Sequence, residues 1–257
     1  MTNPRLELRT LLTAVGLLAL AVTPLLAEGE AKAESQRSPE AMQVLEAADK
    51  AIKAVHSVRF HSSVAADGGA AYFVAPAEGS GHMSGWVSGG PEKFYGTVTT
   101  TPPGTDTAIK VEGGGNGDTF FVIDHHTKKG YEDMDPAVLG TTGQALSNIG
   151  LMEFVHSDPF SDELTADTVE YLGEVTVGDE PCHKIHVVYS GGRGKSTWFF
   201  SKNDHLPRQR IRYFETPQGD GTVTITVSQI EVNPKIDPAD YTMQLPEGYE
   251  QIDDFAP

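Results

Sequence analysis

The most suggestive chemical motif in the chain is a glycine-rich run that resembles a phosphate-binding loop. Residues 191–197 read Gly-Gly-Arg-Gly-Lys-Ser-Thr. A phosphate-binding loop needs a further glycine five residues before Gly194, where this chain has Tyr189. It also needs a helix after the loop, whereas Thr197–Ser201 has the composition of a strand. We therefore predict a hairpin turn here, and for the same reason a turn at the glycine-rich residues 113–118.

Nine histidines are the next candidates, as ligands of a metal ion. His183 and His186 are three residues apart, a spacing that places them on opposite faces of a strand. The adjacent His125 and His126 diverge in the same way, and the chain has no His-Glu-x-x-His motif. The only cysteine, Cys182, excludes an intramolecular disulfide and a cysteine-based zinc site. We predict neither a metal nor a cofactor.

Nothing in the sequence makes a positive case for an enzyme. The chain has no Gly-x-Ser-x-Gly nucleophile motif, because the serine of Gly81-His82-Met83-Ser84-Gly85 lies one place too late. Its 36 acidic residues are too numerous to single out a catalytic pair. We therefore predict a non-enzymatic protein, with a secreted hydrolase as the least favoured alternative.

Length and charge restrict the remaining classes. The chain has 257 residues and a formal charge of −17, from 19 Lys and Arg against 36 Asp and Glu. This charge disfavours nucleic-acid binding and docking on anionic lipid surfaces, both of which need clustered basic residues. A total of 27 glycines and 16 prolines favours many turns between short strands.

Residues 1–33 are predicted to be a secretory signal peptide. A short basic region precedes the apolar run Leu11–Val22, which is shorter than the roughly 20 residues that a spanning helix needs. Cleavage is expected after Ala27 or Ala33, and the alternative is an uncleaved membrane anchor. We expect a periplasmic or otherwise extracytoplasmic protein, soluble and without stable membrane insertion once the signal is removed.

The rest of the chain is predicted to form one helix followed by many strands in a single domain, residues 34–257. Ser38 and Pro39 form a favourable helix start, and apolar residues then recur at helical spacing as far as Val55. From there the apolar period changes to two in runs that include 71–74 and end with Thr222–Ile230. Short connections predict an antiparallel sheet. A helical interlude near 136–152, weakened by its glycines, is predicted to cover this sheet as a movable lid.

Three arginines on one predicted strand stand out against the acidic background. Arg208, Arg210 and Arg212 alternate with Ile211 and Tyr213. One interpretation is a solvated outer face beside the threonines of Thr222–Ile230, paired with nearby carboxylates. The other is a contact strip for an anionic partner or a lipid headgroup.

The large apolar residues of the strands are predicted to converge on a concave interior. Together with two residues of the interlude, the candidates for lining a ligand cavity are Phe60, Trp86, Phe94, Phe121 (or its neighbour Phe120), Leu146, Ile149, Trp198, Phe200 and Tyr213. The alternative is an ordinary packed core.

Several short motifs occur in an order that is typical of one group of proteins. They are the helix leading into Val55-His56-Ser57-Val58-Arg59-Phe60, Gly85-Trp86-Val87-Ser88-Gly89-Gly90-Pro91-Glu92-Lys93-Phe94, Gly117-Asp118-Thr119-Phe120-Phe121, Tyr171-Leu172-Gly173, Pro181-Cys182-His183, Trp198, Leu206-Pro207-Arg208, Asn233-Pro234-Lys235-Ile236-Asp237 and Leu245-Pro246-Glu247-Gly248-Tyr249. This layout resembles the LolA-like group of periplasmic proteins, which includes lipoprotein carriers and the sensor domain of RseB-type regulators. The second half of the chain resembles the uncharacterised secreted relatives more than the carriers.

The resemblance implies a mainly β fold, an incomplete antiparallel barrel whose concave apolar face is covered by helices and often holds acyl chains. One departure is Gly90, where the carriers have an arginine that helps to hold the lid closed. The leading hypothesis is an exported, non-enzymatic protein that binds a lipid or the acyl chain of a lipoprotein. The alternative is a sensory or scaffold module that binds an envelope protein.

Overall fold

The structure, a computed structural model, describes residues 36–253 with short gaps at 88, 89, 103, 141, 142, 144, 145, 147, 148, 151 and 155. The side chains of 86, 87, 90, 91 and 152 also lie outside the description. The predicted signal peptide lies outside the described residues. Among those that are described, no helix has the length and apolar character needed to cross a bilayer.

Strands dominate the described chain. The helical elements are α1 (Pro39–Lys53), η1 (Gly69–Tyr72), η2 (Pro136–Leu139), η3 (Met152–Phe154), α3 (Ser161–Leu164), η4 (Ser190–Gly192) and η5 (Pro238–Tyr241). The strands are β1 (Gln36–Arg37), β2 (Ser57–Gly68), β3 (Ala77–Val87), β4 (Gly90–Thr100), β5 (Ile109–Gly115), β6 (Phe120–Asp124), β7 (Lys129–Asp133), β8 (Thr168–Val177), β9 (Glu180–Val188), β10 (Lys195–Ser201), β11 (Pro207–Thr216), β12 (Gly219–Val232) and β13 (Glu250–Gln251).

Helix α1 begins as its sequence predicts. The Ser38 hydroxyl oxygen accepts a hydrogen bond from the backbone N–H of Ala41 at 3.1 Å, and Pro39 occupies the first turn. The buried side of the helix carries its apolar residues, Leu45 and Ile52 among them. This face packs against strands, so the amphipathic pattern places α1 on the sheet.

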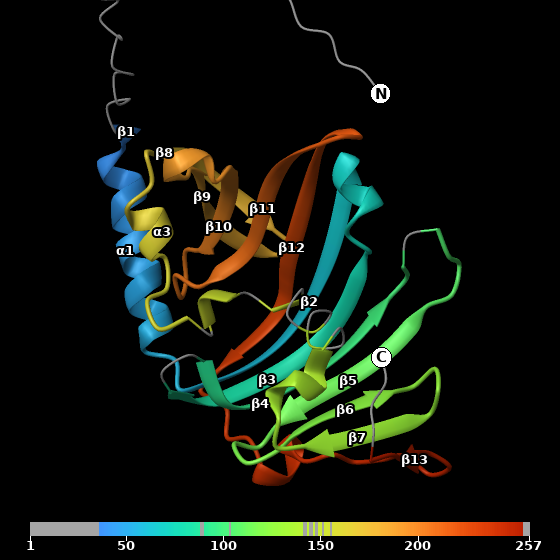
Figure 1. Ribbon diagram of the computed structural model, residues 1–257. Helices are drawn as coiled ribbons and strands as arrows, with labels where there is room; N and C mark the ends of the chain where they lie inside the picture. Colours follow the sequence, from blue (N-terminus) through green and yellow to red (C-terminus); the bar gives the residue numbers. More distant parts are fainter. Residues whose placement is uncertain are drawn as a thin grey trace, which may run out of the picture. The chain divides into compact units, whose positions relative to one another are not determined.

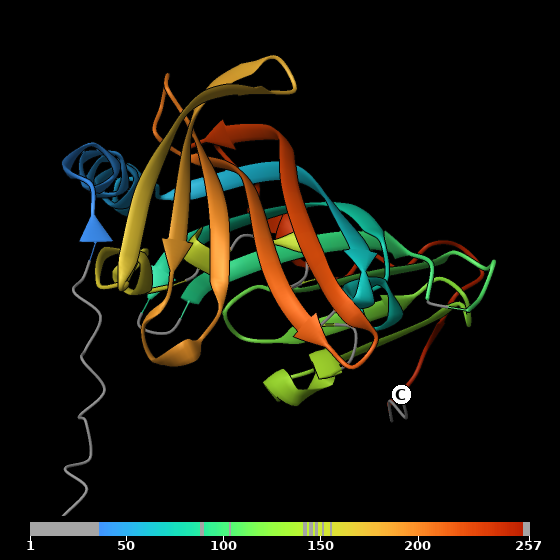
Figure 2. The same ribbon diagram turned by 90° about the horizontal axis from the view of Figure 1, so that it is seen from above.

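The strands form a single curved sheet in the order β1-β8-β9-β10-β11-β12-β2-β3-β4-β5-β6-β7-β13 (Figures 1 and 2). Neighbours are antiparallel except at the two ends, where the two-residue strands β1 and β13 pair in parallel with β8 and β7. The two end strands do not pair with each other, so the sheet remains open. The predicted fold class, an incomplete antiparallel barrel or strongly curved sheet, is confirmed.

One local prediction was wrong and a second was only partly right, and glycines explain both. Residues 71–74 form the end of η1 and a turn instead of a strand, because Gly68 has a φ of +59° that ends β2. Of the predicted turn at 113–118, the three glycines 113–115 belong to strand β5, and residues 116–118 form the connection to β6 as predicted.

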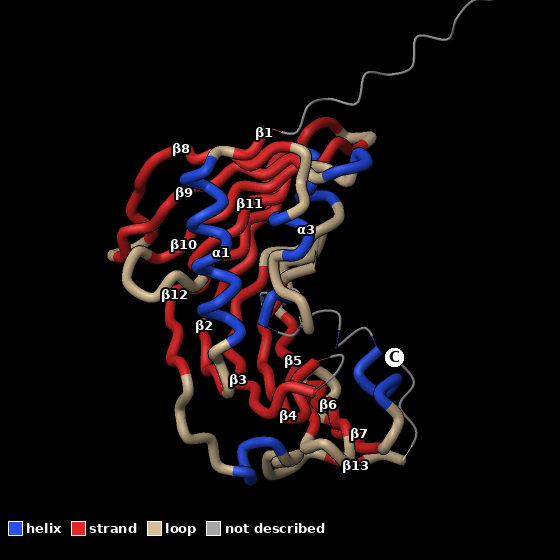
Figure 3. The backbone as a smooth tube through the Cα atoms, turned by 90° about the vertical axis from the view of Figure 1, so that its left-hand side faces the viewer, coloured by secondary structure: helices blue, strands red, loops and turns tan. Residues whose placement is uncertain are grey.

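Two layers of chain cover opposite faces of the sheet. Helices α1 and α3 lie on the concave face together with the described residues of 136–154, which we call the cover segment. Helix α1 crosses strands of the β8–β12 side (Figure 3). The C-terminal segment, residues 238–252, packs on the convex face, where Leu245 approaches Gly130 of β7 and the Tyr241 ring approaches His82 of β3. Residues of both faces are therefore buried.

Candidate binding site on the concave face

The concave face carries a continuous set of apolar side chains from neighbouring strands. Phe60 of β2 and Phe94 of β4 are half-buried there, while Trp198 and Phe200 of β10 are completely buried. Four of the predicted cavity residues thus share this face. The side chain of a fifth, Trp86, lies outside the described residues.

A row of glycines forms a groove in this face. Gly81, Gly96 and Gly113 are direct partners across β3, β4 and β5. Because glycine has no side chain, three adjacent strands carry no side chain on the concave face at this point of the ladder. The Phe60 ring fills the first position, since a Cβ on Gly81 would lie 2.8 Å from its Cζ.

The cover segment fills the rest of the groove. A Cβ on Gly113 would lie 2.6 Å from Leu146 Cδ1, and a Cβ on Gly79 would lie 2.7 Å from Ile149 Cδ1. At distances below 3.0 Å an alanine would displace the ends of these side chains, so Leu146 and Ile149 occupy the space that the glycines leave. The buried hydroxyl of Ser62 also donates a hydrogen bond to the backbone carbonyl of Ile149. The structure therefore brings the predicted residues Leu146 and Ile149 onto the concave face as occupants of the glycine groove.

Phe121 lies on the opposite face, which corrects its assignment to the cavity. It pairs with Gly114 and lies beside Tyr95, at 6.4 Å between ring centroids, beneath the C-terminal segment. Its neighbour Phe120 takes the concave side, where its ring is 6.2 Å from that of Phe94. The two candidates were adjacent in sequence, and strand alternation allows only one of them to face the interior.

Tyr213 also lies on the convex face. Its hydroxyl is 3.1 Å from Thr197 Oγ1, its ring is 6.2 Å from that of His186, and the Lys195 ammonium lies 5.5 Å from the ring centroid. It pairs with Thr222, so it belongs with the polar stripe of β12 and not with the cavity.

The arginines of β11 do not form the predicted strip. Arg210 and Arg212 pair with Ile225 and Val223, on the concave face and away from the threonines of β12. A register shift between Phe199 and Phe200 of β10 separates Arg208 from the other two. Arg208 is buried, with Nη2 at 2.6 Å from Asp204 Oδ2.

Arg210 is part of a buried polar network. Its guanidinium lies 4.6 Å from the ring centroid of Trp198, and its Nη1 is 3.4 Å from Glu153 Oε1. The Trp198 indole N–H donates to the Tyr189 hydroxyl at 3.3 Å, and that hydroxyl donates to Glu163 Oε1 at 2.6 Å. Burial raises the pKa of Tyr189 to about 12, so its hydroxyl remains a donor at neutral pH.

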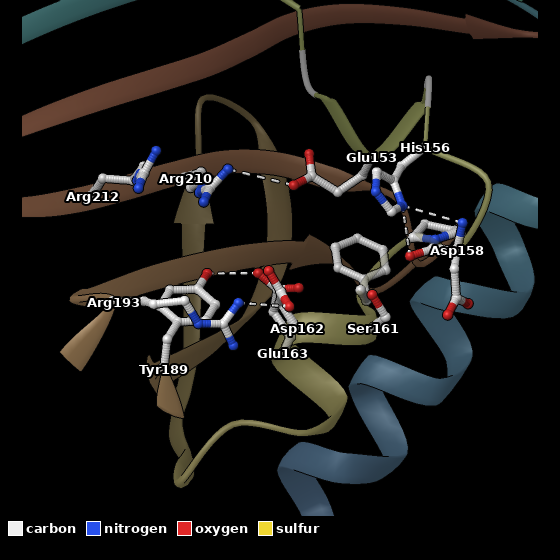
Figure 4. A pocket seen from close by; sticks show the side chains of 12 residues that line it. Glu153, His156, Asp158, Ser161, Asp162, Glu163, Tyr189, Arg193, Arg210 and Arg212 are labelled. Atoms are coloured by element: carbon white, nitrogen blue, oxygen red, sulfur yellow. Dashed lines mark hydrogen bonds and ion pairs between the residues drawn. The ribbon is translucent and has the colours of Figure 1, made fainter. Parts of the chain in front are cut away.

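These groups surround a pocket of about 260 Å³ (Figure 4). Its charged lining consists of Glu153, Asp158, Asp162, Glu163, Arg193, Arg210 and Arg212. Burial is the largest influence on Glu153 and raises the pKa of its carboxyl group, although the charge of Arg210 acts in the opposite direction. Within the described part of the chain, no group of three or more His, Cys, Asp or Glu side chains is placed to hold a metal ion.

Sequence analysis missed this pocket, although it named two of its arginines. Glu153, Glu163 and Tyr189 carry no local motif, and two of them are among 36 acidic residues. The alternation of Arg210 with Ile211 separates the two faces of β11 but does not show which of them is concave, because the register with β10 decides this. Trp198 and Arg210 are direct partners in the ladder.

Comparisons with solved structures give low but consistent similarity. LprF from Mycobacterium bovis is 15% identical, with a TM-score of 0.49 over 82% of this chain and 98% of that chain. MucB is 11% identical, with a TM-score of 0.48 over 80% and 64% of the two chains. A LolA superfamily protein from Nitrosomonas europaea is 12% identical, with a TM-score of 0.30 over 79% and 97%.

A family model assigns the chain more directly. It matches residues 115–254, which run from the end of β5 past the last strand. A search of curated proteins found no match. The family description agrees with the predicted extracytoplasmic location, and on this match the chain belongs to the family described as "Predicted periplasmic protein (DUF2092)".

Proposed function

We propose that this protein is exported and binds a hydrophobic ligand, a lipid or the acyl chain of a lipoprotein, in the glycine groove of its concave face. In this proposal residues 1–33 direct export and are removed, and residues 34–257 are a single binding domain. The observation that supports it most strongly is the way Leu146 and Ile149 of the chain itself occupy the groove. Side chains that occupy a groove without being part of its walls can be replaced by another apolar group of similar width.

The energetics favour an alkyl chain as the occupant. Each buried CH₂ contributes about 0.8 kcal/mol, so a long acyl chain would bury more apolar surface than two side chains. The strands that line the groove are held by their ladders, and this pairing does not involve Leu146, whose side chain lies against Gly113 and Gly96. Displacement of the Leu146 side chain therefore leaves the sheet intact.

The alternative is an envelope sensory or scaffold module that binds a protein partner, and the arginine strip suggested as its contact surface is not formed. Arg208 and Arg210 are engaged with carboxylates of the chain, and Arg208 is separated from the other two by the register shift. Native mass spectrometry of the protein purified from the envelope of its own host tests the choice. A co-purifying lipid in near-stoichiometric amount supports the proposal, and a co-purifying protein without lipid contradicts it.

Replacement of Leu146 by alanine is expected to tighten the binding of a fluorescent fatty acid about fivefold. The variant removes a half-buried side chain that competes with the ligand, a change worth roughly 1 kcal/mol. Fluorescence titration of the purified protein measures the change.

The matched control is Leu172→Ala, because Leu172 is an exposed leucine of β8, 44% accessible, and is not one of the residues that pack on the glycine row. It should leave the affinity unchanged. Unchanged or weaker binding by Leu146→Ala would show that the ligand does not enter the groove.

A further inference from the structure

Arg212 is a cation of the pocket without a close counter-charge. The other two arginines each have one, since Arg193 Nη1 lies 2.9 Å from Asp162 Oδ1 and Arg210 contacts Glu153. No described carboxylate lies within 4.0 Å of the Arg212 guanidinium, which is exposed and lies 5.3 Å from the ring centroid of Phe214. Desolvation lowers the pKa of Arg212 most, followed by the like charge of Arg210. A bound anion would offset both effects, because a nearby negative charge favours the charged form of the guanidinium.

Two buried atoms of the same pocket also lack partners. Arg210 Nε and Glu153 Oε2 are inaccessible to solvent and make no hydrogen bond within the described chain. Buried polar atoms in proteins are almost always bonded, so the unmet Nε–H of Arg210 points to an acceptor that completes it. Glu153 Oε2 is itself an acceptor and does not contribute to binding an anion. Figure 4 shows Arg210 and Arg212 side by side, with Glu153 at the end of the same row.

The pocket borders the glycine groove. Ile225 and Val223, the ladder partners of Arg210 and Arg212, pack against the apolar cluster that contains Ile149. An amphiphile whose charged end contacts these arginines therefore has its alkyl chain at the level of the groove. On its other side, Arg212 borders a second hollow of about 790 Å³, which leaves room for a bulky headgroup.

We propose that this pocket binds the anionic headgroup of an amphiphile, a carboxylate or a phosphate, with Arg212 and Arg210 as its donors. The planar guanidinium presents two parallel N–H groups that match the oxygens of such a group. The inference rests on the proposed function, since the tail of the same ligand occupies the groove. The groove would bind the alkyl chain of the ligand, and the pocket would bind its charged end.

Calorimetric titration with amphiphiles of one tail length tests the headgroup site. The probes are decanoate, decyl phosphate and uncharged decyl maltoside, each below its critical micelle concentration. We expect at least one anionic probe to bind about tenfold more tightly than the maltoside, because a charge-assisted hydrogen bond contributes this much. Arg212→Gln should remove that advantage and leave maltoside binding unchanged. If Arg212→Gln loses this advantage with decanoate alone, the headgroup is a carboxylate. If it loses the advantage with decyl phosphate, the headgroup is a phosphate.

The matched control is Arg59→Gln, which removes the same charge from an exposed arginine that pairs with Glu231. It should preserve the preference for the anion. Equal affinities for charged and uncharged probes, or an anion preference that survives Arg212→Gln, overturn the headgroup site while leaving the groove intact. Binding of none of the three probes overturns the groove and the headgroup site together.

Discussion

Replacement of Trp198 by alanine is expected to lower the free energy of unfolding by about 3 to 5 kcal/mol. The indole is completely buried and lies 5.5 Å and 5.8 Å, between ring centroids, from Phe160 and Phe200. It also supports the Arg210 guanidinium on its face and donates a hydrogen bond to Tyr189. The substitution leaves a cavity that this dense group of rings cannot close. Urea unfolding followed by circular dichroism measures the loss.

An exposed aromatic residue supplies the control. Phe73 follows η1 and is 61% accessible, so Phe73→Ala should change the free energy of unfolding by no more than about 0.5 kcal/mol. A small loss for Trp198→Ala would mean that the region is loosely packed and that the ligand site extends under α1. The expected large loss assigns Trp198 and Phe200 to the packed core, and it confines the ligand to the β2–β5 side.

The sequence predicted the sheet well because strand alternation and turn residues are local signals. Its errors concern the faces of particular strands. A strand buried on one side shows which residues face the core, but β6 is buried on both sides, since the C-terminal segment covers its convex face. Phe120 and Phe121 are then both apolar, and only the register with β5 decides between them. The glycines of β5 were misleading for a related reason, because they serve tertiary packing: Gly113 lies against Leu146, and Gly115 against Phe120 and Phe94.

The polar pocket could not be predicted, because it is assembled from segments far apart in the chain. Glu153 lies in η3 at the end of the cover segment, Tyr189 directly follows β9 and Arg210 lies in β11. No sequence motif of fixed spacing links these three residues. Moreover, the prediction that the arginines share one solvated face rested on period two, and the register shift beside Arg208 breaks that period.

Replacement of Arg210 by methionine is expected to destabilise the protein by about 3 kcal/mol at pH 8 and by less at pH 5. Removal of one partner leaves the Glu153 carboxylate buried without a counter-charge. The size depends on pH because burial raises the pKa of Glu153, Glu163 raises it further, and Arg210 and His156 act in the opposite direction. Without the charge of Arg210, the pKa of Glu153 rises further. An acid whose pKa is higher in the folded than in the unfolded state binds more protons when folded, so its contribution to stability increases as the pH falls. Urea unfolding at the two pH values measures the difference.

The matched variants are Glu153→Gln and the double variant Arg210→Met/Glu153→Gln. Glutamine keeps the shape without the charge, so the double variant should recover most of the loss at pH 8, and its stability should depend less on pH than that of Arg210→Met. A loss that is equal at both pH values and is not recovered by Glu153→Gln would assign the effect to the contact between Arg210 and the Trp198 ring. The expected result would show that this ion pair holds η3, at the end of the cover segment, against β11. Arg210→Met should then also ease entry of the uncharged decyl maltoside into the groove, because one anchor of the segment that occupies it has been removed, whereas the anionic probes lose one of their two proposed donors.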